Sequence, residues 1–262
     1  MGRFHRHDDG TVHTHDHSDP ENHGHEHHDH GDHSGYETGS QRIDVLESIF
    51  AENDIRADYN RKAFESNGIR ALNLMSSPGS GKTTVLGATL DELAGEFAVG
   101  VIEGDIATDL DAAKLGGRGA QISLLNTGNG FGGECHLDAP MVNRALQGLD
   151  LPQLDLVIIE NVGNLVCPAE FDVGEHAKAM VYSVTEGDDK PLKYPVMFRA
   201  VDVVLLNKID LVPYLDVDVD SYLARVREVN PTATILPVSA RTGAGMSAWF
   251  GWLRRFMAGS AA

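Results

Sequence analysis

The sequence is poor in cysteine and in aromatic residues, and it lacks long apolar runs. Two cysteines among 262 residues cannot build a disulfide scaffold, so in a reducing compartment each is a core residue, a nucleophile or a metal ligand. No stretch approaches the roughly 18 consecutive apolar residues of a membrane span, and the first residues do not resemble a secretory signal. We therefore expect a cytoplasmic protein that does not insert into membranes.

Basic residues are also scarce. The chain has 21 Lys and Arg against 39 Asp and Glu, which gives a formal net charge of -18. A surface with this balance repels the phosphates of nucleic acids and of anionic membranes. Nucleic acid is therefore not an expected partner.

The histidines are concentrated at the N-terminus, where residues 5–33 contain eleven of the thirteen. They alternate irregularly with Asp and Glu and show no apolar periodicity, so residues 1–40 are predicted to be a disordered tail. Imidazoles bind nickel, zinc and copper, and neighbouring carboxylates attract cations, so the tail is predicted to bind metal. A purification tag is the alternative, although such tags are usually uninterrupted histidine runs. The candidate tail ligands are His23, His25, His27, His28 and His30.

Residues 41–262 are predicted to form one α/β domain. Apolar spacing from Gln41 to Asn67 indicates a helix that ends near Gly68. Short apolar runs then alternate with helical stretches, which predicts a three-layer fold with a mostly parallel sheet. The polar stretch 186–199 is either a mobile switch or a surface loop. The strand candidates are residues 69–75, 97–105, 120–126, 154–160, 179–184, 201–207 and 233–238.

A phosphate-binding loop is indicated by "SSPGSGKTT", residues 76–84, which follows a strand and opens a helix. Glycines let the backbone approach phosphate, and the amides at the helix start point toward it. Lys82 is expected on the β and γ phosphates and Thr83 on Mg²⁺, although Ser76 stands where the strict pattern has glycine. The candidate phosphate ligands are Gly79, Ser80, Gly81, Lys82, Thr83 and Thr84.

Two further strand ends indicate that the base is guanine. In "NKID", Asp210 can accept hydrogen bonds from guanine N1 and its exocyclic amine, whereas adenine has no matching donors. Lys208 can lie along the base, and Asn207 can tie this loop to the phosphate loop. Ser239 and Ala240 are placed to offer a backbone amide to the guanine carbonyl. Together these strings predict GTP as the nucleotide.

Acidic residues end two other strands, at Asp105 (with Glu103 before it) and at Glu160. Each can hold Mg²⁺ directly or through water and can move when the γ-phosphate leaves. Lys82, Asp105 and Glu160 are therefore the candidate catalytic residues, with Thr83, Asp105 and Glu160 as candidate Mg²⁺ ligands. Whether Glu160 orients the attacking water or the metal stays open.

A second candidate metal site combines Cys135 and His136, which follow the third strand, with Cys167, which follows Glu160. Thiolate and imidazole suit nickel or zinc. Taken alone, these residues favour packing in the core, and a nucleophile with its base is a further alternative. A two-fold dimer is one way to complete such a site.

The strings "NLMSSPGSGKTT", "VIEGDIATDLDA", "GECHLDAPMV", "IIENVGNLVCPAEFD" and "NKIDL", in that order, resemble the HypB family of hydrogenase nickel-incorporation GTPases. The resemblance covers roughly residues 42–258. It implies a GTPase of the class that includes the signal recognition particle and MinD-like proteins (the SIMIBI class). Urease nickel-chaperone GTPases share the nucleotide motifs but match "CHLDA" and "ENVGNLVCP" poorly.

The resemblance also implies a function. Members hand nickel to the large subunit precursor of nickel-iron hydrogenase, together with maturation accessory proteins, and dimerise on nucleotide binding. Cys135, His136 and Cys167 match the family's metal positions at the dimer interface. The cysteine-rich N-terminal motif of some members has no counterpart, since no cysteine precedes Cys135. A protein that mainly stores nickel, or a urease-type chaperone, remains the alternative.

Overall fold

The computed structural model describes residues 4–6, 12–14, 38–104, 115–125 and 136–259. The chain divides into two compact units, Met1–Ile43 and Asp44–Ala262. In the first unit, strand β1 (Phe4–Arg6) pairs antiparallel with strand β2 (Val12–Thr14). The composition of the tail does not predict this pair of strands. The two strands contain Phe4 and Val12, residue types that favour extended backbone. The candidate histidines from His23 to His30 lie outside the described residues.

The second unit is built on a seven-stranded sheet in which every pairing is parallel, in the order β5-β4-β6-β3-β7-β8-β9. The predicted parallel sheet is therefore confirmed, and each strand lies within or overlaps one predicted apolar run. The strands are β3 (Arg70–Ser76), β4 (Val99–Glu103), β5 (Gln121–Leu124), β6 (Leu156–Gly163), β7 (Ala177–Ser183), β8 (Val203–Asn207) and β9 (Thr234–Pro237).

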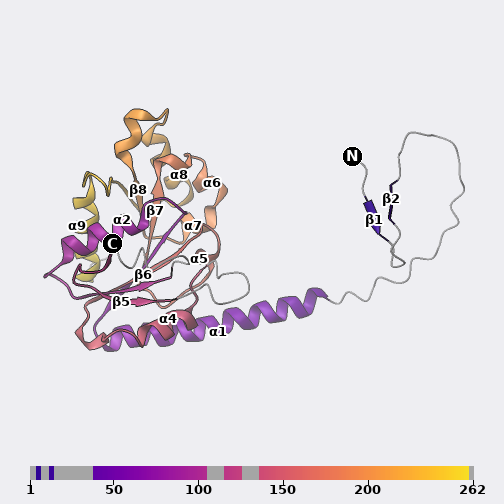
Figure 1. Ribbon diagram of the computed structural model, residues 1–262, viewed down its shortest axis with the longest axis horizontal. Coiled ribbons are helices and arrows are strands. Elements are labelled where there is room, and N and C mark those ends of the chain that lie inside the picture. The colour runs from indigo at the N-terminus through magenta and orange to yellow at the C-terminus, as the bar shows by residue number, and fades with distance from the viewer. Residues whose placement is uncertain (1–3, 7–11, 15–37, 105–114, 126–135, 260–262) are drawn as a thin grey trace, which may run out of the picture. The chain divides into compact units, whose positions relative to one another are not determined.

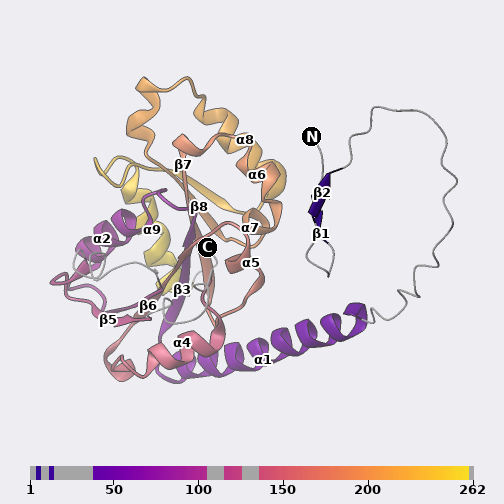
Figure 2. The ribbon, with the colours of Figure 1, turned by 45° about the vertical axis from the view of Figure 1, so that its right-hand side comes forward.

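Helices cover both faces of this sheet (Figures 1 and 2). The α-helices are α1 (Thr38–Ser66), α2 (Lys82–Leu93), α4 (Ala139–Leu146), α5 (Cys167–Glu170), α6 (Lys190–Lys193), α7 (Pro195–Arg199), α8 (Val219–Val229) and α9 (Met246–Met257). The 3-10 helices are η3 (Leu151–Gln153), η4 (Val184–Glu186) and η5 (Ile209–Tyr214).

Alternate residues of each strand enter different cores. Ile158 of β6 packs in the core that contains α2 and α9, whereas Val157 and Ile159 pack with α1 and α4. Tyr182 of β7 and Leu206 of β8 pack with α7 and α8 on the same face as α1. Because both faces are covered, most strands carry apolar residues at successive positions rather than only at every second one.

The buried face of α1 carries amides as well as apolar side chains. Asn53, Ala57, Asn60 and Phe64 are spaced to lie on one side of a helix, and all four are buried. The helix ends two residues before Gly68, whose φ of 72° suits the glycine that commonly follows a helix. The predicted helix and its end are thus present.

The segment 186–199 is not the plain loop that its polarity predicts. It forms α6 and α7, and Met197 and Phe198 of α7 are fully buried. Most charged residues of this segment precede Met197 and Phe198, so the sequence pattern does not indicate that this apolar pair enters the core.

Candidate functional site

The loop between β3 and α2 lies close to the end of β8 because of glycine. Gly79 and Gly81 have φ values of 73° and 99°, which disfavour any residue with a side chain. A Cβ atom on Gly81 would lie 2.6 Å from Nδ2 of Asn207. Glycine at position 81 therefore satisfies both a backbone and a packing requirement.

Lys82 is held almost wholly buried at the end of β6. Its Nζ donates to the backbone oxygen of Asn161 at 2.5 Å and lies 3.1 Å from Oε1 of Glu160. The side chains of Lys82 and Glu160 are 6% and 0% exposed. Removing either partner of such a pair leaves an uncompensated buried charge, which typically costs about 3–5 kcal/mol.

Glu160 also joins the start of α2, because Oγ1 of Thr83 donates to its Oε1 at 3.0 Å. Its other oxygen, Oε2, is buried and has no hydrogen-bond partner among the described residues. Glu103 is the register partner of Glu160 on β4 and is also buried. The Thr83 hydroxyl and the Glu160 carboxylate, with Glu103 on the neighbouring strand, are oxygen ligands of the kind that Mg²⁺ prefers, so these residues fit that ion. The third expected ligand, Asp105, lies outside the described residues.

Asn207 connects the phosphate loop with the last two strands. Its Nδ2 donates to the backbone oxygen of Ser80 at 2.9 Å, which is the tie to the phosphate loop that its position predicts. Its Oδ1 accepts from the backbone N–H of Ala240 at 3.0 Å. The segment of Ser239 and Ala240, expected to offer a backbone amide to the guanine carbonyl, is thus held against Asn207. The hydroxyl of Ser80 is buried and has no hydrogen-bond partner among the described residues.

A pocket of about 370 Å³ opens beside Asn207. Lys208 shapes its rim, since its φ is 63° and its Nζ donates to the backbone oxygen of Gly79 at 2.5 Å. Asp210 is oriented by Ser239, whose hydroxyl donates to Oδ1 at 2.7 Å. The pocket is lined by Gly81, Thr84, Asn207, Lys208, Asp210, Leu211, Ala240 and Arg241. Residues from three separate motifs thus meet around one cavity.

Ser77 and Glu186 form a contact that the sequence did not suggest. The Ser77 hydroxyl donates to Oε2 of Glu186, and Oε1 accepts from the backbone N–H of Ser183 at 2.8 Å. Burial raises the pKa of the Glu186 carboxyl, although both hydrogen bonds and the charges of Lys190 and Lys208 oppose that shift. A carboxyl group from the 186–199 segment therefore supports the phosphate loop.

The expected metal ligands are placed only in part. The ring of His136 stacks on Phe171 with centroids 4.1 Å apart, and Phe171 directly follows α5, which begins at the half-buried Cys167. The structure thus brings the His136 and Cys167 segments together. Cys135 lies outside the described residues. Among the residues described, no three His, Cys, Asp or Glu side chains form a group that could hold a metal ion.

Two asparagines of α1 hold both of these segments. Asn53 accepts from the backbone N–H of Ala139 at 2.9 Å and donates to the backbone oxygen of Asp172 at 2.8 Å. Asn60 donates to the backbone oxygens of Ala139 at 2.9 Å and Val173 at 3.0 Å. Sequence patterns miss such residues because an asparagine in an amphipathic helix reads as part of its solvated face.

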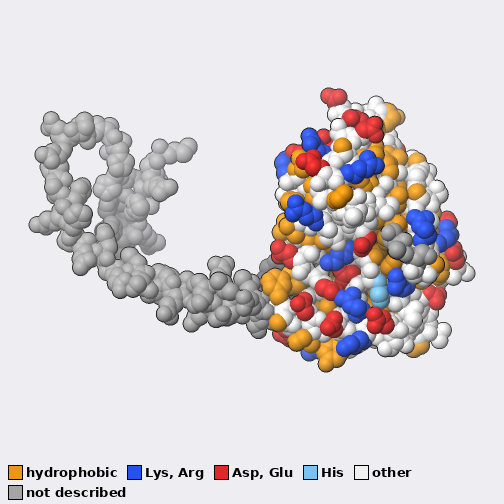
Figure 3. Space-filling view, turned by 180° about the vertical axis from the view of Figure 1, so that it is seen from behind, with side chains coloured by type: hydrophobic (Ala, Val, Ile, Leu, Met, Phe, Trp, Pro, Cys, Tyr) orange, Lys and Arg blue, Asp and Glu red, His pale blue; other side chains and the backbone are white. Residues whose placement is uncertain are grey.

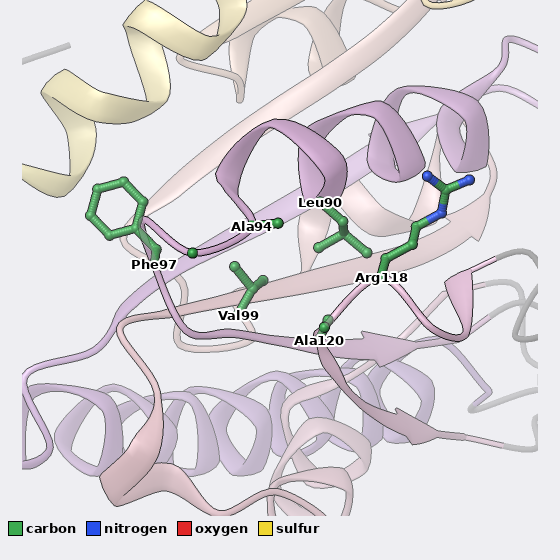
Figure 4. A pocket seen from close by; sticks show the side chains of 8 residues that line it. Leu90, Ala94, Phe97, Val99, Arg118 and Ala120 are labelled. Atoms are coloured by element: carbon green, nitrogen blue, oxygen red, sulfur yellow. The ribbon is translucent and has the colours of Figure 1, made fainter.

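A smaller pocket lies between the end of α2 and the start of β5 (Figure 4). Its volume is about 60 Å³, room for roughly two water molecules. Leu90, Phe97 and Val99 supply apolar walls, and Arg118 at its edge pairs with Asp91. The pocket is too small for a nucleotide.

The outer surface of the described residues mixes charges of both signs, as Figure 3 shows for one face. Within that part of the chain, no helix has both the length and the apolar character needed to cross a membrane.

Known proteins resemble this chain in both sequence and fold. Residues 70–237 match the family model described as "CobW/HypB/UreG, nucleotide-binding domain". The hydrogenase maturation factor HypB of Azotobacter chroococcum mcd 1 is 50% identical over 216 residues, covering 82% of this chain and 70% of that protein. The crystal structure of HypB from Archaeoglobus fulgidus has a TM-score of 0.73 at 37% identity, covering 79% of this chain and 99% of that one. HypB from Helicobacter pylori in complex with nickel gives 0.73 at 36% identity, covering 79% and 95%.

Proposed function

The chain belongs to the HypB branch of the CobW/HypB/UreG family, and on this premise we propose that it is a cytoplasmic nickel metallochaperone that hydrolyses GTP to GDP and phosphate. Its acceptor is the large subunit precursor of nickel-iron hydrogenase, reached with other maturation proteins. The relatives named above are hydrogenase maturation factors, and one was crystallised with nickel.

The observation that carries the GTPase proposal is the joining of the base pocket to the phosphate loop through Asn207. Asp210 presents a carboxylate to the pocket, and Ser239 fixes one of its oxygens. The other oxygen suits the N1 and amine donors of guanine. The volume of the pocket suits the base. A carboxylate that faces the bound base disfavours a base that leaves it unpaired, so adenine nucleotides are disfavoured.

In hydrolysis, Lys82 releases its contacts with Glu160 and Asn161 and binds the β and γ phosphates. The amides of Ser80 and Gly81 add donors to the phosphate oxygens at the start of α2. Mg²⁺, when bound by Thr83, Glu160 and Asp105, neutralises charge on those oxygens. We assign Glu160 to the metal rather than to the attacking water, because Thr83 already contacts the same carboxylate.

The nickel proposal rests on Cys135, His136 and Cys167. The contact of His136 with Phe171 supports it, because it joins the two segments that carry these residues. Thiolates and imidazole bind nickel and zinc alike, so zinc is a competitor for the same ligands. A second copy of the chain supplies the remaining ligands in the dimer that we propose forms with GTP and metal.

Nucleotide state controls this metal site in the proposed cycle. GTP and Mg²⁺ order the segments at Asp105 and Glu160, which support the loops bearing the metal ligands, and hydrolysis releases nickel. The histidine-rich tail adds storage. Nickel storage does not require the guanine-binding residues Asn207, Lys208 and Asp210, so storage is proposed as a second role only.

The test first measures GTP hydrolysis by the full chain. It then compares the nickel content and dimer fraction of the full chain with a non-hydrolysable GTP analogue, with GDP and without nucleotide. Hydrolysis should require Mg²⁺ and fall sharply in Lys82→Ala. Lys193→Ala is the control, since it breaks the ion pair of another lysine, with Asp189 on the surface, and should retain hydrolysis. Full activity of Lys82→Ala, or nickel content and dimer fraction independent of nucleotide, would contradict the proposal.

A further inference from the structure

Strand β6 contains an irregularity at the phosphate site. Leu74 of β3 pairs with Glu160, but Ser76 pairs with Gly163, so the register shifts across Asn161 and Val162. Such bulges interrupt the ladder and redirect local backbone groups and side chains. Here the backbone oxygen of Asn161 accepts from Lys82, and the N–H of Val162 donates to the Asn161 side chain.

The side chain of Asn161 reaches from this bulge to the segment after His136. Its Oδ1 accepts from the backbone N–H of Leu137 at 3.0 Å and from that of Val162 at 2.9 Å. An amide oxygen has two lone pairs, so both are in use. Asn161 and Leu137 are fully buried, so neither bond is shared with solvent. One residue therefore contacts both Lys82 and the neighbour of His136.

The remaining side of Asn161 is anchored. Its Nδ2 donates to Oδ1 of Asn73 at 3.2 Å, and Nδ2 of Asn73 donates to Oε1 of Glu175 at 3.3 Å. Glu175 accepts from the backbone N–H of Val173 at 2.7 Å and pairs with Lys178 at 3.3 Å. This buried chain fixes Asn161 on one side and leaves the contacts with Lys82 and Leu137 as the ones that respond to ligand.

We propose that Asn161 is the positioning residue through which the state of Lys82 is transmitted to the His136 segment. The inference rests on the proposed function, in which nucleotide controls the metal site. When phosphate takes the donors of Lys82, the peptide of Asn161 loses a partner. Because the peptide oxygen and the side chain belong to one residue in a bulge, the Leu137 hydrogen bond changes with it.

Asn60 provides a matched control for this proposal. It is as deeply buried as Asn161, and it bonds to Ala139 and Val173, close to both metal segments. Among the described residues, its hydrogen-bond partners include no residue of the phosphate loop. Asn60→Ala should therefore weaken the metal site in every nucleotide state, whereas Asn161→Ala should remove the difference between states.

The experiment titrates the full chain with nickel against a competing chelator and follows the thiolate-to-nickel absorption band. This band reports Cys135 and Cys167 alone, because the tail contains no cysteine. Nickel affinity with a GTP analogue and with GDP should differ by about 5- to 150-fold in the unchanged chain, the usual range of coupling between sites. The ratio should fall to near one in Asn161→Ala and be retained in Asn60→Ala. An unchanged ratio in Asn161→Ala would overturn the inference.

Hydrogen exchange on the unchanged chain keeps the inference testable if Asn161→Ala does not fold. The Leu137 amide should exchange at different rates with the GTP analogue and with GDP, without added nickel. Equal protection would overturn the role of Asn161. If the unchanged chain shows no nucleotide effect on nickel affinity, the proposed function has failed instead, so the two failures are distinguishable.

Discussion

Asn207 and Ser80 are 127 residues apart in the chain, yet Nδ2 of Asn207 donates to the backbone oxygen of Ser80 at 2.9 Å. The same amide group accepts from Ala240. One side chain thus sets the spacing between the phosphate loop and the base pocket, and nucleotide affinity should depend on it.

Asn207→Ala leaves the Ser80 oxygen and the Ala240 N–H without this partner. Each buried group left unpaired costs about 1–3 kcal/mol, so GTP affinity should fall at least roughly 5- to 150-fold. Calorimetric titration with GTP measures this. Asn230→Ala is the control, because Asn230 is also buried and donates to the backbone oxygens of Phe198 and Val201. It should lower the melting temperature and leave GTP affinity intact; equal losses of affinity would indicate a general folding defect.

Asp210→Asn should change the preferred base. Asparagine can donate to the oxygen that xanthine carries in place of the guanine amine, whereas its amide opposes guanine donors. We expect a loss of GTP binding of about 10²-fold or more and a gain for xanthosine triphosphate, measured by competition against a fluorescent nucleotide. Retained selectivity for GTP would exclude Asp210 from base recognition.

Glu186→Gln should change the pH dependence of stability. Burial raises the pKa of Glu186 in the folded chain, so the folded state binds the proton more tightly than the unfolded state. The stabilisation linked to that proton is present below the unfolded pKa and is lost as pH rises through the folded value. The free energy of unfolding of the variant, relative to the unchanged chain, should therefore increase as pH rises above about 4.5, the ordinary pKa of this carboxyl group.

Urea unfolding at several pH values measures that difference. Glu228→Gln removes the same charge from an exposed position and serves as the control for net charge. A difference between Glu186→Gln and the unchanged chain that does not vary with pH would contradict the assignment.

Deletion of residues 1–40 should separate storage from delivery. The shortened chain loses eleven histidines, so equilibrium dialysis should find fewer nickel ions per chain. GTP hydrolysis and hydrogenase activation should persist, because the nucleotide residues lie beyond position 75. Unchanged nickel capacity would remove the storage role, and lost hydrogenase activation would show that the tail takes part in delivery.

Much of this fold could be predicted because its signals are local. Each strand is a short apolar run, and Gly81, Lys82 and Asp210 occur in strings whose spacing is set by phosphate and guanine chemistry. Those residues are recognisable without knowing their neighbours in space.

Asn161, Asn60 and Glu186 could not be predicted in the same way. Each acts through partners 24 to 113 residues away, and nothing in their local sequence specifies those partners. Asn161 lies inside an apolar strand, where a register shift that no pattern predicts gives its backbone and side chain their partners. The α6 and α7 helices were missed because only Met197 and Phe198 in that segment are apolar and buried together.

The all-parallel sheet also governs when the nucleotide site can exist during folding. Every pairing in this sheet is parallel, including those of β3 with β6 and β7, so each one requires a long crossover to close first. The contact of Asn207 in β8 with the phosphate loop forms only after that. Sheets of this kind fold slowly, because the entropy of loop closure is lost before the contacts form. A chain still emerging from the ribosome therefore carries its complete phosphate loop sequence long before it can bind GTP. Nucleotide binding, once it begins, stabilises only the fully assembled sheet.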